Sequence, residues 1–175
     1  PGKIKPGTTT EGIASSIDLY ATLAELAGAP LPENTKLDSI SLVDTILNGA
    51  ETKRDVFAYY KGPNLEAVRK GDWKLHFAKT GWNSDEGEIN QLYNLRDDVG
   101  ETTDVYADNP DVVKQLEAEA EKFREIFGDA RLEREGSEIR ECGKVEDPKP
   151  LTEYREDHPY MIACYDLADM PTMAG

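Results

Sequence analysis

The sequence predicts an α+β fold in which a long amphipathic helix packs on an antiparallel sheet of about four strands. Apolar and polar residues alternate in three successive segments, 56–60, 65–69 and 73–77, with the period of half-buried strands. Gly71 stands between the second and third segments, where a tight reversal needs a residue at positive φ, so these two strands are expected to form a hairpin. One apolar stripe along residues 110–127 predicts the helix.

Two helices are expected before the sheet. The first is predicted to begin at Ser15 or Ser16 and to end near Gly28, because prolines follow. Its polar residues form one narrow stripe and apolar residues cover the other faces, so this helix is expected to need partners on nearly all sides. The stripe consists of Asp18, Thr22 and Glu25. A second, shorter helix is predicted over 41–47, closed by Asn48-Gly49.

After the hairpin, residues 79–90 are polar and contain glycine, which predicts a surface loop. This loop carries Trp82, and an exposed loop tryptophan is a candidate binding residue; packing against the sheet edge is the alternative interpretation. Residues 92–95 then predict a short fourth strand. His76 alternates with the apolar residues of the third strand and is expected to lie on its solvent side.

The adjacent acids Asp97 and Asp98 do not have the spacing of a calcium loop, in which oxygen ligands recur about every second residue. They are expected to form a turn in which aspartate carboxylates accept backbone amides and Gly100 is left-handed. The long helix is then expected to begin at Asp108 or Asn109 and to stop at Gly128. Its apolar stripe consists of Val113, Leu116, Ala120, Phe123 and Phe127.

Composition excludes several functional classes. The net charge is −15 and the pI is near 4.5, so the surface repels polyanions and no nucleic-acid partner is expected. No apolar run approaches the roughly 18 residues that a membrane span requires. The only two cysteines, Cys142 and Cys164, match no metal-binding spacing, and whether they form one disulfide or two free thiols is open.

Several motifs in order carry a resemblance to a known family. The run A-V-R-K-G-D-W-K-L (67–75) is followed by L-Y-N-L-R-D-D-V-G-E-T-T-D (92–104) and then by the long helix. This order resembles the C-terminal region of the sulfatase family, within the alkaline-phosphatase-like superfamily. The segments 15–29 and 37–49 are similar to those that precede the sheet in the same family.

The resemblance implies a division of the chain. Residues 1–50 are expected to be the remnant of an N-terminal α/β sulfatase domain that is otherwise missing, and 51–129 to form the C-terminal sheet-plus-helix subdomain. Residues 130–175, which are charged and without clear periodicity, are expected to form an extended C-terminal tail.

The family also implies a chemistry. Sulfatases hydrolyse sulfate esters with a formylglycine made from a C/S-x-P/A-x-R motif, usually with calcium. Neither cysteine and no serine here stands in that motif, and the family's acidic metal ligands would precede Pro1. We therefore expect no catalytic and no metal-binding residue in this chain, calcium being a cofactor of the intact enzyme. The expected substrate-binding residues are Trp82 and Asn83 in the loop and His158 in the tail. The resemblance further implies a periplasmic or secreted protein.

Two other functions are open. The chain is alternatively a stand-alone, non-catalytic acidic interaction module that uses its first helix as a docking surface. A phosphodiesterase or phosphonate hydrolase of the same superfamily is a further alternative, although G-D-W-K-L and D-V-G-E-T-T-D resemble sulfatases more closely.

Overall fold

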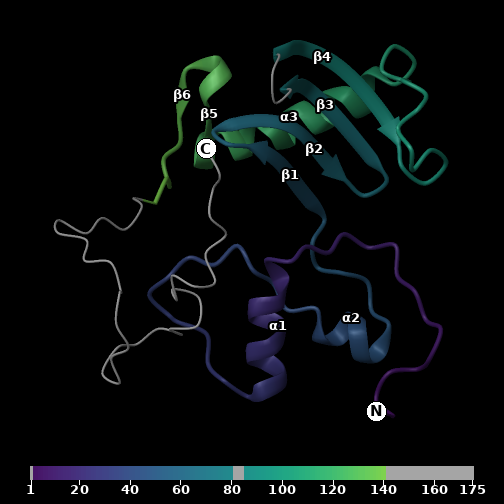
Figure 1. Cartoon of the computed structure of the whole chain (residues 1–175), viewed down its shortest axis with the longest axis vertical. Coiled ribbons are helices and arrows are strands. Elements are labelled where there is room, and N and C mark those ends of the chain that lie inside the picture. Colours follow the sequence, from purple (N-terminus) through teal and green to yellow (C-terminus); the bar gives the residue numbers. More distant parts are fainter. Residues whose placement is uncertain (1, 81–84, 141–175) are drawn as a thin grey trace, which may run out of the picture. The chain divides into compact units, whose positions relative to one another are not determined.

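Four antiparallel strands in chain order form the main sheet of the computed structural model, which describes residues 2–80 and 85–140 (Figure 1). The strands are β1 (Val56–Lys61), β2 (Asn64–Lys70), β3 (Trp73–Thr80) and β4 (Asp85–Asn94). Gly71 lies at φ +55° in the two-residue turn between β2 and β3, as the alternation and the glycine predicted. The expected four-stranded antiparallel α+β sheet is therefore confirmed.

The fourth strand is longer than predicted. The pairing of β3 with β4 runs from Trp73↔Asn94 to Thr80↔Asp85, with register shifts between His76 and Ala78 and between Ala78 and Thr80. Most of the segment 79–90 that was expected to be a loop is thus strand. The polar side chains of this segment gave no strand pattern in the sequence, because backbone pairing at a sheet edge does not require an apolar face.

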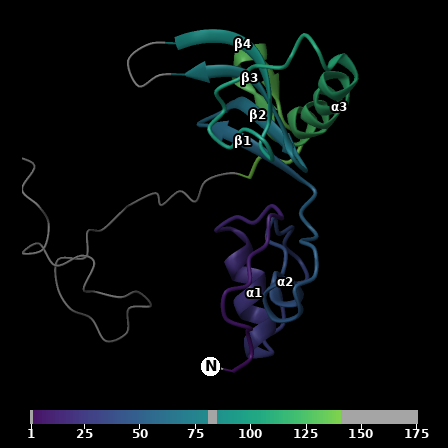
Figure 2. The same ribbon diagram turned by 90° about the vertical axis from the view of Figure 1, so that its right-hand side faces the viewer.

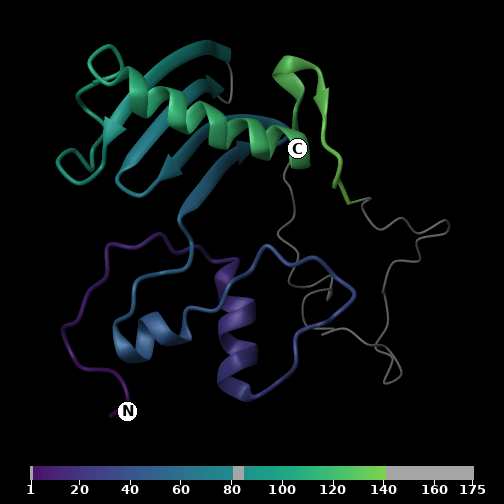
Figure 3. The same cartoon turned by 180° about the vertical axis from the view of Figure 1, so that it is seen from behind.

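The long helix α3 (Pro110–Phe127) lies across one face of the sheet (Figures 2 and 3). Its stripe residues Val113, Leu116 and Ala120 are buried there. They join a core cluster with the residues that the strands present to the same face: Leu65, Val68, Leu75, Phe77 and Leu92. In the register of the sheet, Val68 pairs with Leu75 and Leu75 with Leu92, so one row of core residues crosses three strands.

The end of α3 is held against the sheet by a buried ionic cluster. Gly128 ends the helix at φ +79° and begins a two-residue strand, β5 (Gly128–Asp129), that pairs with β6 (Arg134–Glu135) beyond a 3-10 turn, η1 (Ala130–Leu132). Asp129 is fully buried, and its Oδ2 accepts Nε of Arg124 at 3.2 Å. Its Oδ1 accepts the amide of Leu65 at 3.4 Å. The hydroxyl of Tyr60 donates to the Gly128 carbonyl at 2.9 Å, and burial, then the charge of Asp129, raises the pKa of Tyr60 to about 12.

Two short helices precede the sheet, α1 (Asp18–Ala27) and α2 (Val43–Asn48). Both end at a left-handed glycine, Gly28 and Gly49, as predicted. The start of α1 differs from the prediction at Ser15 or Ser16, because Ile17 occupies the N-cap position. The carboxylate of Asp18 accepts the amide of Ser15, three residues earlier, at 3.0 Å. This contact resembles the one in a capping box, where the N3 side chain accepts the N-cap amide.

Two of the three polar stripe residues of α1, Asp18 and Thr22, face inward, and Glu25 is exposed, so this helix differs from an ordinary surface helix, which buries its apolar side. Ala21 is buried beside them, whereas the large apolar residues of the helix, Leu19, Tyr20, Leu23 and Leu26, are exposed. The Asp18 carboxylate accepts Nε of Arg54 at 3.0 Å and the Ile40 amide at 3.0 Å, and the Thr22 hydroxyl accepts the Leu42 amide at 3.0 Å. The loop between α1 and α2 is therefore anchored to the polar side of α1.

The turn after β4 is only partly as predicted. The Asp98 carboxylate accepts the amides of Thr102 and Thr103 at 2.7 and 2.8 Å, which confirms its expected role. The left-handed residue, however, is Glu101 at φ +54° and not Gly100. The contacts of the Glu101 side chain with Lys74 and His76 on the sheet offset the strain of this left-handed conformation.

Candidate functional site

The substrate-binding residues predicted from sequence are not placed by the structure. Trp82, Asn83 and His158 lie outside the described residues, as do Cys142 and Cys164. The ends of β3 and β4 at Thr80 and Asp85 fix only where the connection that carries Trp82 and Asn83 begins and ends. Their assignment to substrate binding stays a prediction.

The sheet face opposite α3 carries aromatic and basic side chains. Two rows cross the four strands on this face, because residues paired across antiparallel strands share a face. The paired residues of the first row are Phe57, Arg69, Lys74 and Tyr93, and those of the second are Tyr59, Ala67, His76 and Gln91. The alternation in the sequence places all eight on one face, but it does not show what lies above them.

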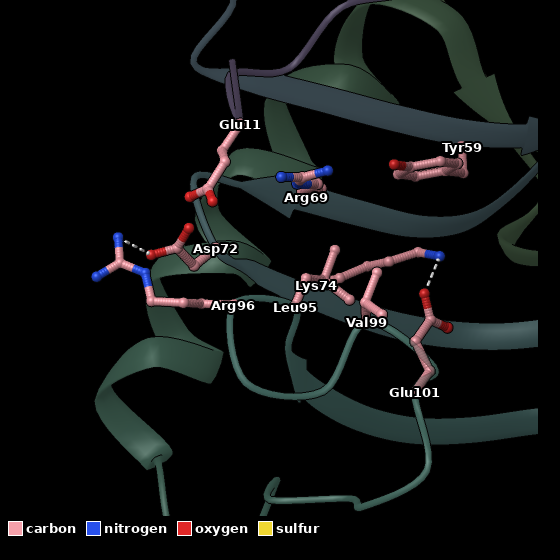
Figure 4. Close-up of a pocket in the computed structure, with 9 residues that line it drawn as sticks. All are labelled: Glu11, Tyr59, Arg69, Asp72, Lys74, Leu95, Arg96, Val99 and Glu101. Carbon is pink, nitrogen blue, oxygen red and sulfur yellow. Dashed lines mark hydrogen bonds and ion pairs between the residues drawn. The ribbon is translucent and has the colours of Figure 1, made fainter. Parts of the chain in front are cut away.

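A pocket of about 340 Å³ opens over this face (Figure 4). Its lining comes from three strands, from the turn between β2 and β3, from the turn after β4 and from the segment before α1: Glu11, Tyr59, Arg69, Asp72, Lys74, Leu95, Arg96, Val99 and Glu101. Figure 4 shows an ion pair toward either side of the pocket and Arg69 between Glu11 and Tyr59. Arg96 Nη2 lies 2.7 Å from Asp72 Oδ2, and Arg69 donates from Nε to the Gly71 carbonyl at 2.8 Å.

Glu101 joins Lys74 and His76 into one charged group. Lys74 Nζ lies 2.6 Å from Glu101 Oε1 and 4.6 Å from the ring centroid of Tyr59. His76 Nε2 lies 2.9 Å from Glu101 Oε2. Burial alone raises the pKa of Glu101, but the hydrogen bond and charge of Lys74, followed by the contact with His76, outweigh it and hold that pKa below its ordinary value.

His76 was predicted to lie on the solvent side of its strand. Its side chain is only 18% exposed, so the surface around it is not open to solvent. Desolvation by burial, then the charge of Lys74, lowers the pKa of His76, although Glu101 opposes the shift. His76 is therefore neutral near pH 7. Since the carboxylate of Glu101 can only accept, the neutral imidazole donates its Nε2–H to it. The ring meets that of Tyr93 edge to face at 5.7 Å.

The lowered pKa of His76 gives a pH dependence of stability. A group whose pKa is lower in the folded state than in the unfolded state binds more protons when unfolded. The contribution of His76 to the free energy of unfolding is therefore complete above about pH 6.5 and is lost as pH decreases through the pKa of the folded state. We expect the free energy of unfolding to decrease between pH 7.5 and 5.5, and His76→Gln to reduce that decrease. Urea titrations of both proteins at the two pH values measure the difference. An equal decrease in both would contradict this assignment.

A second hollow, also about 340 Å³, lies over the end of α3. Its lining includes Phe77, Arg124 and Arg131, and the Arg124 guanidinium stands 4.8 Å over the Phe77 ring. Arg124 and Arg131 both pair with the buried Asp129. The cations of this hollow thus neutralise a buried carboxylate, which indicates a structural role.

Neither of these two hollows brings a hydroxyl or thiol nucleophile together with a metal site. Among residues 2–80 and 85–140, no three histidine, cysteine or acidic side chains come together as a metal site. The linings contain no serine, threonine or cysteine. Within the same ranges, no helix has both the length and the apolar character to cross a bilayer.

Residues 52–146 match a family described as the C-terminal region of aryl-sulfatase. The chain is 45% identical over 86 residues to arylsulfatase A of Homo sapiens, a match over 46% of this chain and 17% of the relative. It is 32% identical over 126 residues to N-acetylgalactosamine-6-O-sulfatase of Bacteroides thetaiotaomicron, a match over 66% of this chain and 24% of the relative. The chain thus spans no more than about a quarter of these relatives.

Solved structures show the same similarity. One solved structure, from work on the metabolism of multiple glycosaminoglycans by Bacteroides thetaiotaomicron, superposes with a TM-score of 0.57 at 32% identity. The match covers 71% of this chain and 27% of that chain. A sulfatase from Pseudoalteromonas sp. superposes with a TM-score of 0.56 over 70% of this chain and 28% of that chain. At 24% identity, the second match shows the fold alone.

Proposed function

Because this chain belongs to the family of aryl-sulfatase C-terminal regions, we propose that it forms the C-terminal part of an enzyme that hydrolyses sulfate esters. The observation that carries the proposal is the family match over 52–146, which includes the whole four-stranded sheet, α3, β5 and β6. The matched segment is thus the structural unit built around the core, and not a short motif. Fold likeness alone would not license an activity, but the named relatives are sulfatases.

The role of this chain in that enzyme is to support the fold and to shape the substrate entrance. The formylglycine nucleophile and calcium that the family resemblance implies do not fit the described residues, which hold no cluster of metal-ligating side chains. We assign both to another part of the enzyme. The entrance would be shaped by the connection between β3 and β4, through Trp82 and Asn83, and by His158. A periplasmic or secreted location belongs to the same proposal.

The chain assayed alone is expected to show no turnover of 4-nitrophenyl sulfate, with or without added calcium. The reason is that the described pockets lack a nucleophile and a metal site. Release of 4-nitrophenol measures the rate, and a longer protein that includes this chain serves as the positive control. Turnover by the chain alone, above that of a heat-denatured sample, would show that the active site has been misplaced.

In the full enzyme, Trp82→Ala is expected to raise KM for an aryl sulfate about two- to tenfold, since an aromatic pair contributes about 0.5–1.5 kcal/mol. The kcat should change little, because the side chain would bind the ground state and the transition state alike. Steady-state kinetics separate the two constants. Ile139→Ala, which truncates an exposed apolar residue elsewhere, is the control. An unchanged KM would remove Trp82 from the substrate entrance.

The phosphodiesterase or phosphonate hydrolase alternative is tested with the same full enzyme. We expect a kcat/KM for 4-nitrophenyl sulfate well above that for bis(4-nitrophenyl) phosphate, because the named relatives are sulfatases. The reverse order would favour the alternative. The interaction-module alternative draws support from the exposed apolar residues of α1, such as Leu19, Leu23 and Leu26.

A further inference from the structure

The sequence contains a single Asn-Gly pair, Asn48-Gly49, which stands at the exposed C-terminal end of α2. An asparagine followed by glycine is chemically labile, because the backbone nitrogen of the glycine can attack the asparagine Cγ and glycine has no Cβ to hinder the approach. The attack needs a mobile backbone and a free amide. The local structure around this pair therefore decides how fast the reaction runs.

In the closed helix, both reacting groups are engaged elsewhere. The amide of Gly49 donates to the Thr45 carbonyl at 3.1 Å. The side chain of Asn48 donates from Nδ2 to Asp44 Oδ1 at 2.6 Å, one turn earlier in the helix. Closing a ring between the two groups would also move ψ of Asn48 away from the helical value of about −42°. Closed α2 thus suppresses the reaction.

The C-terminal half of α2 is weakly held. The helix has six residues, none of which is buried, and a helix this short has little stability of its own. Its N-terminal end is anchored, because the buried Leu42 donates its amide to the Thr22 hydroxyl at 3.0 Å. Near its C-terminal end, the hydrogen bond from the Thr45 hydroxyl to the Glu51 carbonyl is long, at 3.5 Å. Segments with few buried contacts open locally at a small cost in free energy, so this end is expected to open without global unfolding.

We propose that Asn48 is a site of spontaneous deamidation and that the opening of α2 sets its rate. In the open state the Gly49 nitrogen loses its proton and bonds to Asn48 Cγ, and the Cγ–Nδ2 bond breaks to release ammonia. The resulting succinimide ring contains Cα, Cβ, Cγ and the carbonyl carbon of Asn48 and the nitrogen of Gly49. Water then opens the ring at either carbonyl, which leaves aspartate or isoaspartate at position 48. The net reaction consumes one water and releases one ammonia, and it is independent of the proposed function.

Both products weaken the helix end that delays the reaction. Aspartate at position 48 places a second carboxylate beside Asp44, where Nδ2 of Asn48 donates at present. Like charges four residues apart repel each other, and a negative charge at the C-terminal end also opposes the helix dipole. Isoaspartate adds a methylene to the main chain, so the amides of Gly49 and Ala50 no longer align with the carbonyls of the last turn. The modified α2 is therefore expected to open more often than the original helix.

The rate is measured on the purified full 175-residue chain at neutral pH. Peptide mapping by mass spectrometry follows conversion at position 48, and chromatography separates the aspartyl and isoaspartyl peptides. We expect conversion in the folded chain to be at least about tenfold slower than in the chain unfolded by urea. Asn94, which leucine follows, is the internal control and should stay unchanged. In urea, Gly49→Ala should slow conversion about tenfold, because its Cβ hinders the attack.

Two substitutions of Ile46 test the dependence on α2. Ile46 is 38% exposed and takes no part in the reaction. Glycine has a lower helix propensity than alanine, so Ile46→Gly should raise the opening equilibrium about fivefold over Ile46→Ala. Conversion at Asn48 should be faster by the same factor in the folded chain and equal in urea. Hydrogen exchange of the Gly49 amide reports the opening itself and should follow the same ratio, while amides of 110–127 should not change.

The effect of the product is measured on Asn48→Asp. After correction for the intrinsic exchange rate, its Gly49 amide should exchange about two- to fivefold faster than that of the wild type. Equal conversion in the folded and unfolded chains, or no conversion at position 48 even in urea, would overturn the proposal. So would equal conversion of the two Ile46 variants in the folded chain while their Gly49 exchange differs. A difference between the Ile46 variants that disappears in urea would support it.

Discussion

Asp18→Ala is expected to lower the free energy of unfolding by about 3–5 kcal/mol, because removing one partner of a buried ion pair leaves the other without compensation. Asp18 is fully buried, and the Arg54 side chain is 13% exposed. Arg54 would keep the Asp38 carbonyl, to which Nη2 donates at 2.8 Å, and the Phe57 ring at 5.8 Å, and neither carries a negative charge. The amides of Ser15 and Ile40 would also lose their acceptor. Urea denaturation followed by circular dichroism measures the change.

The matched control for this substitution is Asp44→Ala on α2. Asp44 is exposed, and its carboxylate accepts only the side chain of Asn48, so its loss should cost less than about 1 kcal/mol. A cycle with Arg54→Ala should show that the two losses do not add, since both break the same pair. Equal effects of Asp18→Ala and Asp44→Ala would mean that the buried pair does not hold α1.

Local signals were sufficient for most of the fold. The alternation in 56–77, the glycine at 71 and the stripe in 110–127 all depend on contacts between residues close in sequence, and the sheet and α3 follow them. The helix ends at Gly28 and Gly49 were equally predictable, because only glycine adopts a left-handed conformation at low cost.

Partners on other elements decided what the periodicity of a single element did not predict. Arg124 lies on α3 beside the apolar stripe and would be expected at the surface, yet it is buried because Asp129 binds it from beyond the helix. The N-terminal half of β4 is polar and was predicted as a loop, although its backbone pairs with β3. Periodicity carries no information about such partners.

The candidate site also combines features that local patterns predict with one that they do not. Tyr59, Arg69 and Lys74 share a face because side chains alternate along each strand and the register pairs these residues. The position of Glu101 above Lys74 and His76 could not be predicted, because it depends on a loop whose left-handed residue is a glutamate beside a glycine. The predicted residues Trp82, Asn83 and His158 lie outside the described ranges and stay predictions.

Asp129→Ala is expected to cost about 3–5 kcal/mol, because Arg124 and Arg131 would lose the buried carboxylate between them. Asp129 is fully buried, and it also joins α3 to the sheet through the amide of Leu65. The hydrogen bond from Arg124 Nη1 to Glu121 at 2.6 Å survives, but it does not replace the partner of Nε. Equilibrium unfolding in urea gives the loss, which we expect to exceed that of any exposed carboxylate.

Two further variants distinguish charge from hydrogen bonding at this position. Asp129→Asn keeps an acceptor for Leu65 but removes the negative charge, so its cost should fall between that of Asp129→Ala and that of the exposed control Asp108→Ala, which should be within about 0.5 kcal/mol of zero. If Asp129→Asn were as stable as the wild type, neutralisation of Arg124 and Arg131 would not be what holds the end of α3. Since both guanidiniums converge on one carboxylate, we expect the charge to contribute more than the single amide contact at 3.4 Å.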